Sequence, residues 1–254
     1  PVDCASRSYS LFIRQCLGTS RNRMATLLKN GALFLHVPKT GGSWVRHVLR
    51  EQGLVKMEWP HPHPDLDRVL NLPRYYPLHF AKQSLKHQSL RLYREIQESY
   101  KFCFVRAPHS WYESYWRFMQ GHEWKSFHEE RQRERTILLK RPWHPNAFLE
   151  DIGRRDFRTF MQMVLTEYPG YLTQMYGWYA PPREIDFVGQ TESLVDDLLD
   201  ALSRAGITVD EEAVRNTEKV NTSPSRIDRP EWDDELRNAV HRLEAPVFER
   251  FGYE

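Results

Sequence analysis

ALFLHVPKTGGSWVRHVL (residues 32–49) carries the strongest local pattern in this chain. Its first six residues are apolar and β-prone, which predicts a short buried strand over 32–37. Pro38 ends that strand, because proline cannot donate a hydrogen bond to the sheet. Apolar residues then recur at helical spacing from Trp44 to Leu49. The stretch therefore predicts a strand, a turn of small residues and a helix.

The turn has the composition of an anion-binding loop. Gly41 and Gly42 allow the main chain to approach a ligand closely, and Thr40 and Ser43 carry hydroxyl groups. Lys39 adds a positive charge near the start of the helix, where unpaired amide groups attract anions. The alternative is an ordinary β–α turn in which the two glycines only break regular structure. The full strand–turn–helix context favours a phosphate-binding loop.

The position of the lysine argues against a nucleoside-triphosphate loop. That loop reads G-x-x-x-x-G-K-[ST], with its lysine after the second glycine. In this chain Lys39 precedes both glycines, and the sequence contains no GK[ST].

A second motif has the same order of elements. Residues 101–117 read KFCFVRAPHSWYESYWR, with a predicted buried strand over 102–105 that ends at Arg106. Pro108 suits the first turn of a helix, and Ser114 lies about two turns into that helix. An arginine at a strand end and a serine on the following helix can converge on one phosphate.

Together, the two motifs resemble those of the sulfotransferases that use 3′-phosphoadenosine 5′-phosphosulfate (PAPS). PKTGGSW at 38–44 is similar to the 5′-phosphosulfate loop of that family, and the arginine–serine pair is similar to its 3′-phosphate motif. In the family, the lysine contacts the transferring sulfonate, the small residues hold the 5′-phosphate and the closing aromatic residue packs on adenine. The resemblance implies a donor-binding set of Lys39, Thr40, Gly41, Gly42, Ser43, Trp44, Arg106 and Ser114.

The distal part of the chain resembles the same family. Residues 184–189 predict a strand, and a helix capped by Thr191 is predicted over 191–205. Many family members close over the nucleotide with a late basic or Asn/Ser-containing loop. This resemblance, against the alternative of a plain surface loop, adds to the donor-binding candidates Lys219, Asn221 and Arg226.

The family's reaction needs a general base, and histidine suits this role because its pKa lies near working pH. Related sequences often place a histidine shortly before the 3′-phosphate arginine, as His79 stands here. His79 is therefore the first candidate and His63, in a proline-rich loop after a predicted strand over 54–59, is the second. For each, the alternative is a structural histidine, which is also the role predicted for His36.

Composition places the chain among soluble globular proteins. It has 254 residues, of which 40% are hydrophobic and 28% charged, and its net charge of +2 gives no sign of nucleic-acid or membrane binding. An odd count of three cysteines favours a reducing, cytoplasmic compartment. The start at Pro1 leaves open a removed signal or anchor. No metal-ligand spacing is visible, and the oligomeric state stays open.

Periodicity adds further elements to these motifs. It predicts helices over 85–98, 156–167 and 231–243 and a weaker strand over 75–81. For the aromatic segment 171–179, core packing is the default, and a position at the border of the acceptor cleft is the alternative.

These patterns together predict a three-layer α/β/α fold with a mainly parallel central sheet and a phosphate-binding loop after the first strand. The sulfotransferase domain is expected over 31–254, after an N-terminal extension over 1–30. The expected reaction is sulfonate transfer from PAPS, without a metal, to a hydroxyl or amine of an acceptor.

The acceptor is less well defined by the sequence. A carbohydrate or small metabolite is favoured, because PKTGG resembles the carbohydrate branch of the family, although the closing Trp44 is typical of the cytosolic branch. The alternatives to a sulfotransferase are a kinase-like P-loop protein that binds a nucleotide, and a non-catalytic relative that binds a nucleotide or glycan.

Overall fold

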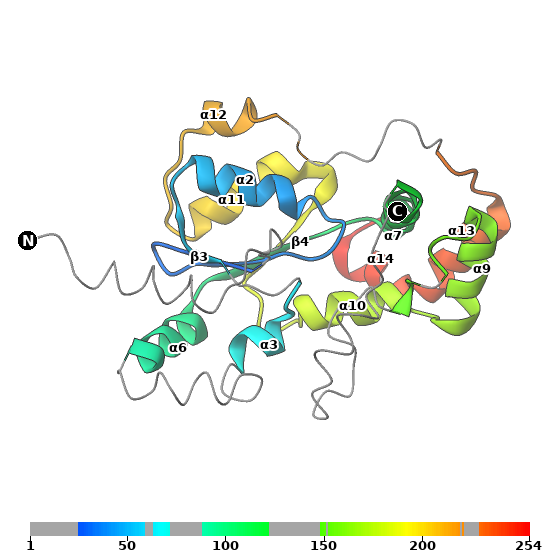
Figure 1. Cartoon of the computed structure of the whole chain (residues 1–254), viewed down its shortest axis with the longest axis horizontal. Coiled ribbons are helices and arrows are strands. Elements are labelled where there is room, and N and C mark those ends of the chain that lie inside the picture. Colours follow the sequence, from blue (N-terminus) through cyan, green and yellow to red (C-terminus); the bar gives the residue numbers. More distant parts are fainter. Residues whose placement is uncertain are drawn as a thin grey trace, which may run out of the picture.

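The computed structural model of the chain describes residues 25–58, 63–71, 88–121, 148–150, 152–218, 220 and 229–254. These residues form a mixed α/β fold around a five-stranded sheet (Figure 1). The strands are β1 (Thr26–Leu28), β2 (Leu33–Leu35), β3 (Val55–Glu58), β4 (Lys101–Val105) and β5 (Phe187–Gln190). Their order across the sheet is β3-β1-β2-β4-β5.

Four of these five strands run in the same direction. β2 pairs parallel with β4, and β4 pairs parallel with β5. β1 pairs antiparallel with both β2 and β3, so it opposes the others. The sheet is therefore mixed but mostly parallel in strand direction. β1 lies inside the segment assigned from the sequence to the N-terminal extension, yet it has a strand on each side. The loop that was predicted to follow the first strand therefore follows the second, β2.

Helices join and cover the strands. They are α2 (Gly42–Glu51), α3 (Leu66–Leu70), α6 (Gln88–Glu98), α7 (Pro108–Gly121), α9 (Phe157–Glu167), α10 (Tyr171–Tyr179), α11 (Leu194–Arg204), α12 (Glu211–Arg215), α13 (Asp234–Leu243) and α14 (Ala245–Phe251). The helices predicted over 85–98, 156–167 and 231–243 correspond to α6, α9 and α13. The strand predicted over 75–81 lies outside the described residues.

The predicted cap at Thr191 is wrong. A 3₁₀ turn, η2 (Thr191–Ser193), precedes α11, and the Thr191 hydroxyl donates to the carbonyl of Val105 at 2.8 Å. The side chain therefore ties the turn after β5 to the end of β4 instead of satisfying the first amides of α11.

Side chains alternate between the two faces of the sheet, as strand geometry requires. Leu33 and Leu35 of β2 belong to the core cluster that includes α7, α9 and α10, whereas Phe34 belongs to the cluster that includes α2 and α11. Figure 1 shows α2 and α11 on one side of the sheet and α3, α6 and α10 on the other. The aromatic segment 171–179 is core, as predicted: Tyr171, Tyr176 and Tyr179 of α10 are buried.

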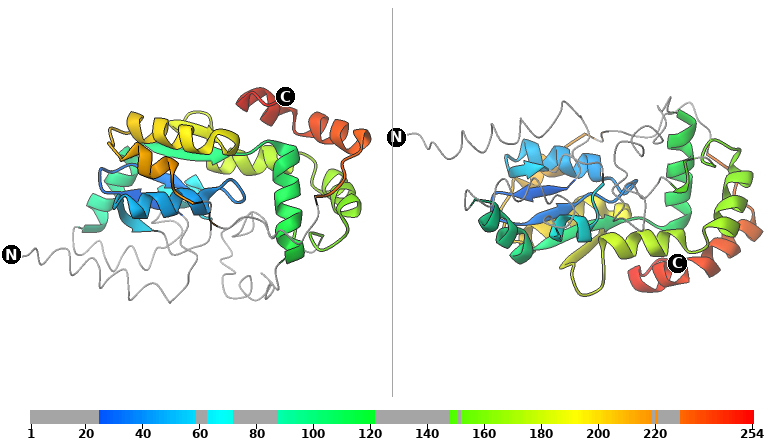
Figure 2. Two further views of the ribbon diagram at one scale, coloured as in Figure 1. Left: turned by 90° about the horizontal axis from the view of Figure 1, so that it is seen from above. Right: turned by 60° about the horizontal axis from the view of Figure 1, so that its bottom comes forward.

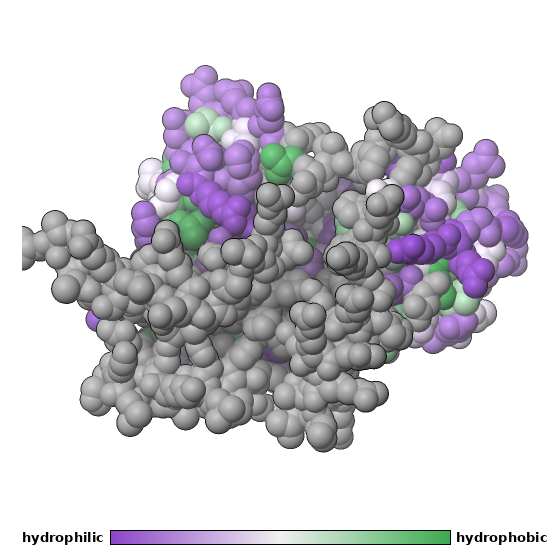
Figure 3. Space-filling model, in the orientation of Figure 1, coloured by the Kyte–Doolittle hydropathy of each residue, from purple (hydrophilic) through white to green (hydrophobic). Residues whose placement is uncertain are grey.

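Beyond one end of the sheet, α7, α9 and α13 pack together (Figure 2). The described surface in Figure 3 is mostly hydrophilic over α12 and over α9 and α13. Among the helices that the structure describes, none is long and apolar enough to span a bilayer.

Candidate functional site

The sheet topology brings the two sequence motifs together. After β2 the chain passes through α2 to β3, whereas after β4 it continues to β5 on the opposite side. The carboxyl ends of the adjacent parallel strands β2 and β4 therefore form a switch point, where α/β sheets bind ligands. Lys39 follows β2 and Arg106 follows β4. The two loops meet directly, since Arg106 Nη1 donates to the Lys39 carbonyl at 3.5 Å.

The carbonyl groups of the loop after β2 are held by side chains of the protein. The three consecutive carbonyls of residues 37–39 accept, in that order, from Thr40 Oγ1 at 3.0 Å, Trp111 Nε1 at 2.8 Å and Arg106 Nη1 at 3.5 Å. The buried Thr40 hydroxyl thus stabilises the loop itself, and its amide is the group left to meet a ligand.

The amide groups of the same loop show the opposite pattern. The N–H groups of Lys39, Thr40, Gly41, Gly42 and Ser43 donate no hydrogen bond within the described part of the chain. Lys39 and Gly41 have left-handed backbone angles, with φ of 66° and 76°. Turns that mix left-handed and right-handed residues can direct successive amides toward one point, which makes a concave anion site.

The start of α2 adds to this positive potential. Its first turn contains no acidic residue, and its N-cap residue is Gly41, so no N-cap side chain accepts a hydrogen bond from the first amides. The unpaired amides and the helix dipole therefore stay uncompensated by any side chain of the first turn. This arrangement of donors can bind a phosphate or a sulfonate.

Both glycines of the loop are required by packing against the protein itself. A Cβ on Gly42 would lie 2.1 Å from Cδ2 of His36, and a Cβ on Gly41 would lie 2.5 Å from Cδ2 of Leu194. The buried His36 ring therefore supports the loop from below. This gives His36 the structural role that the sequence predicts.

Lys39 extends over an aromatic ring on α7. Its Nζ lies 4.0 Å from the centre of the Phe118 ring, a distance typical of a cation–π contact. Burial, with a further effect of the Arg106 charge, lowers the pKa of Lys39 to about 7. An anion beside Lys39 would favour the protonated form and raise that pKa.

The backbone and side chain of Arg106 are both restrained. The Tyr176 hydroxyl accepts from the Arg106 amide at 3.1 Å and donates to its carbonyl at 2.8 Å. Arg106 Nε donates to Ser110 Oγ at 3.0 Å. Burial lowers the pKa of Arg106, whereas the nearby Glu192 carboxylate raises it. The guanidinium is thereby fixed at the end of β4, facing the loop after β2.

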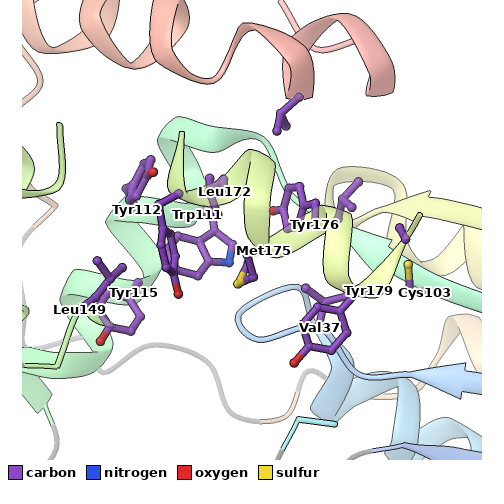
Figure 4. Packing of buried hydrophobic residues seen from close by; sticks show 14 of the residues in the cluster. Val37, Cys103, Trp111, Tyr112, Tyr115, Leu149, Leu172, Met175, Tyr176 and Tyr179 are labelled. Atoms are coloured by element: carbon purple, nitrogen blue, oxygen red, sulfur yellow. The ribbon is translucent and has the colours of Figure 1, made fainter. Parts of the chain in front are cut away.

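Ser114 lies on α7 and is 7% exposed, with no hydrogen bond from its side chain to any described residue. Trp111 and Phe118 precede and follow it by three and four positions, so the three residues share one helix face. Sequence reasoning missed these two aromatic contacts to the loop, although helical spacing from Ser114 could have identified them. Figure 4 shows Trp111 among the buried side chains of α7 and α10.

Trp44 is buried in the core cluster above the sheet. It is 6% exposed, and its indole Nε1 donates to the carbonyl of Thr217 at 3.3 Å. This contact ties α2 to the segment that leads into the predicted late loop. The packing of Trp44 on adenine stays a prediction.

His63 is the second candidate base and lies near the loop. Its Nδ1 donates to the carbonyl of His36 at 3.0 Å, and the two rings meet edge to face with centroids 4.8 Å apart. A carbonyl only accepts hydrogen bonds, so Nδ1 carries the proton and the lone pair lies on Nε2. The residue has a φ of 48°, an uncommon conformation for a side chain of this size.

The environment keeps His63 neutral at physiological pH. Burial is the largest cause of a pKa lowered to about 4, the hydrogen bond to His36 opposes it, and the charges of Arg46 and Lys39 lower it further. A neutral imidazole is the form that a general base requires. The first candidate base, His79, and the loop candidates Lys219, Asn221 and Arg226 lie outside the described residues.

Comparisons with protein-family models, with curated proteins and with solved structures each find no match for this chain. Within the described ranges, no cluster of three or more His, Cys, Asp or Glu residues has the arrangement of a metal site. Two surface pockets lie apart from the loop, one between the β1–β2 turn and α6 and one beside β5 and α14.

Proposed function

We propose that this protein is a sulfotransferase that moves a sulfonate group from PAPS to a hydroxyl or amine of an acceptor. One observation carries the proposal. Five consecutive amides, those of residues 39–43, have no acceptor within the described chain, and they stand beside Lys39 and Arg106 at the switch point of the sheet. The resemblance of the two motifs to the PAPS-dependent family supports the same function.

In this proposal the loop after β2 is a phosphate-binding loop in a three-layer α/β/α domain. The amides of residues 40–43 would hold the 5′-phosphate, and Lys39 would lie at the bridging oxygen between phosphate and sulfonate. Positive groups fixed before the reaction stabilise the charge that develops on the leaving phosphate. Because the carbonyls of the loop are held by side chains, the amides need not reorganise to do this.

Arg106 and Ser114 would bind the 3′-phosphate. Arg106 has its Nε committed to Ser110, and its Nη1 reaches the Lys39 carbonyl. Its terminal nitrogens therefore lie on the loop side, where an anion bound to the loop would be. Selection for a 3′-phosphate would distinguish PAPS from ATP, which lacks that group.

A histidine would take the proton of the acceptor as its oxygen or nitrogen attacks sulfur and the bond from sulfur to the 5′-phosphate oxygen breaks. His63 has the required neutral form, with its lone pair on Nε2. The negative charge of a bound donor near Lys39 and Arg46 would raise the pKa of His63 from about 4 toward its ordinary value. That change would make His63 a stronger base when the donor is present. His79 is the other candidate for this role.

A carbohydrate hydroxyl or a small metabolite is the proposed acceptor. This choice rests on the PKTGG form of the loop and on the resemblance to the carbohydrate branch of the family.

The first test is thermal unfolding of the protein with 3′-phosphoadenosine 5′-phosphate (PAP), with ADP and with ATP plus magnesium. A ligand at about 100 times its dissociation constant adds roughly 2.7 kcal/mol of stability. We expect stabilisation by PAP and little by the other two nucleotides. Stabilisation by ATP with magnesium and not by PAP would instead indicate a kinase.

Site variants then separate donor binding from chemistry. We expect Lys39→Ala to lower turnover by about 10²–10³-fold, as loss of one transition-state donor does. Arg106→Ala should mainly weaken PAP binding. Arg204→Ala, which removes an exposed charge paired with Asp200 on α11, is the control. Unchanged PAP binding and sulfonate transfer in both site variants would contradict the assignment, and PAP binding without any transfer would favour the non-catalytic relative.

A further inference from the structure

We propose that Glu192 positions Arg106 for recognition of the 3′-phosphate, and that it acts through the hydroxyl of Ser110. This inference rests on the proposed function. Glu192 lies in the 3₁₀ turn η2 directly after β5.

The Glu192 carboxylate joins three separate parts of the fold. Its Oε1 accepts from the amide of Ala107 at 3.0 Å and lies 3.3 Å from Ser110 Oγ. Its Oε2 accepts from the Tyr253 hydroxyl at 3.3 Å. One side chain thus links the turn after β5 to the chain terminus and to the residues around the start of α7.

Ser110 connects this carboxylate to the arginine. Its Oγ accepts from Arg106 Nε at 3.0 Å, so its single proton must be donated elsewhere. The acceptors in range are Glu192 Oε1 and the Ala107 carbonyl, at 3.3 Å and 3.1 Å. When the proton points to either acceptor, a lone pair of the hydroxyl is left to face Arg106. Glu192 additionally anchors the Ala107 amide, which follows Arg106 in the chain.

The result is a guanidinium with one fixed edge. Ser110 occupies the Nε side of Arg106, and the Tyr176 hydroxyl restrains its peptide groups. Rotation of the side chain is thereby limited, and the terminal nitrogens stay on the side of Lys39. An arginine prearranged in this way loses less conformational entropy when it binds a phosphate.

The charge of Glu192 acts in a second, opposite manner. The negative charge of Glu192 favours the cationic form of Arg106 in the empty site. The same charge would repel a phosphate bound nearby. The geometric and electrostatic effects can be separated, because glutamine keeps the acceptor oxygen and removes the charge. If positioning dominates, Glu192→Gln should keep the selectivity for the 3′-phosphate and Glu192→Ala should lose it.

The experiment measures, by titration calorimetry, the dissociation constants of PAP and of adenosine 5′-phosphate, which lacks the 3′-phosphate. The ratio of the two constants reports recognition of the 3′-phosphate, whereas general loosening of the site weakens both ligands alike. We expect Glu192→Ala to reduce this ratio about tenfold, the size of one charge-assisted hydrogen-bond network lost. Glu192→Gln should stay within about twofold of the original protein.

Ser110→Ala cuts the same link from the other side and should reduce the ratio to a similar extent. The double variant should fall no further than Glu192→Ala alone, because that change already removes the link through Ser110. If Glu192→Ala does not fold, Ser110→Ala and Glu192→Gln still provide the test. Thr191→Val is the matched control, since it loosens η2 at the bond to Val105 without touching Ser110, and it should leave the ratio unchanged.

Two results would overturn the inference while the proposed function stands. The first is a ratio of the two dissociation constants in both Glu192→Ala and Ser110→Ala that equals the ratio of the unaltered protein. The second is a loss of this ratio in Thr191→Val as large as the loss in Glu192→Ala. If the unaltered protein itself does not prefer PAP over adenosine 5′-phosphate, the proposed function fails, and this inference fails with it.

Discussion

Two helices of this protein begin with the same local structure, but the groups around their first amides have opposite charge. α2 starts after Gly41 and α10 starts after Gly170, both with left-handed φ angles, of 76° and 70°. In both helices the N-cap makes no side-chain hydrogen bond and the first turn has no acidic residue. At both helix starts, therefore, neighbouring residues in the sequence provide no side-chain acceptor for the first amides.

At α10 the protein supplies its own anion. The buried carboxylate of Glu244 accepts from the amides of Leu172 and Thr173 at 3.0 Å and 2.9 Å, and from the Thr173 hydroxyl at 2.8 Å. The Tyr112 hydroxyl donates to the same carboxylate at 2.6 Å. The first amides of α10 are thus satisfied without any ligand.

At α2 the surroundings have the opposite charge. Lys39 and Arg106 lie beside the unpaired amides, and no described carboxylate accepts from them. Helix starts that lack an internal acceptor are satisfied by water or by a ligand. The difference between the two helices supports the proposed donor site, in which an anion from outside the chain would bind at α2.

The largest effect is expected from removing the internal anion of α10. Glu244→Ala leaves two amides and two hydroxyls without their acceptor in the core, which should lower the free energy of unfolding by about 3–5 kcal/mol. Urea denaturation followed by circular dichroism measures this loss. Glu235→Ala, which removes an exposed carboxylate of α13 that pairs with Arg158 of α9, is the control and should change stability by less than about 0.5 kcal/mol. A loss below about 1 kcal/mol for Glu244→Ala would show that α10 does not depend on this carboxylate.

The converse change gives α2 an anion of its own. Ser43→Asp places a carboxylate in the first turn of α2, where it should add about 0.5 kcal/mol of stability through the helix dipole. The same charge should repel PAP and weaken its binding roughly 100-fold, because it occupies the region that attracts the phosphate. Calorimetry measures the binding, with Ser43→Asn as the uncharged control. PAP binding equal to that of the original protein would place the anion site elsewhere.

The two helix starts also show which features of the structure can be predicted from the sequence. Residues 32–49 predict β2, the turn and α2 because their signals are local: an apolar run, a proline, two glycines and a helical repeat. The same holds for β4 and α7. Proximity of the two motifs follows from strand order, because β2 and β4 are neighbours, and local patterns do not specify that order.

Long-range partners were not predictable in the same manner. Glu244 lies more than 70 positions after the start of α10, and its acceptor role depends on where α13 and α14 fold back onto that helix. Glu192 reaches Ala107 across a comparable separation. The close contact of Gly42 with the His36 ring depends on tertiary packing, which no local pattern could indicate. The antiparallel strand β1 was likewise not predicted, because its segment has no strong apolar repeat.

An intermediate effect on PAP binding is expected from pH, because the positive charge beside the start of α2 is that of a lysine, Lys39. The pKa of Lys39 is lowered to about 7 in the empty site, and a bound anion should raise it. Below pH 7, Lys39 is already protonated, and its contribution to binding is constant. Above pH 7, PAP must bind together with a proton, so its dissociation constant should rise about tenfold from pH 7.5 to 8.5.

The pH effect is measured by calorimetry in buffers with different heats of ionisation, which also counts the protons taken up. Lys39→Arg is the control, because arginine stays protonated over this range, and its PAP affinity should not fall with pH in the same way. An unaltered protein whose PAP affinity is constant from pH 7 to 9 would contradict the role of Lys39 in anion binding.

The smallest expected effect compares the two N-cap glycines directly. An alanine in the left-handed region costs about 1 kcal/mol of stability, which applies equally to Gly41→Ala and Gly170→Ala. A Cβ at Gly170 meets nothing closer than 3.5 Å, whereas a Cβ at Gly41 would lie 2.5 Å from Leu194 Cδ2. Gly41→Ala should therefore cost about 1 kcal/mol more, which urea denaturation can resolve. In a Leu194→Ala background the two costs should become equal, because the clash is gone and only the backbone strain remains. Equal costs already in the original background would mean that Leu194 moves aside freely, and that the loop of α2 is less tightly supported than its contacts indicate.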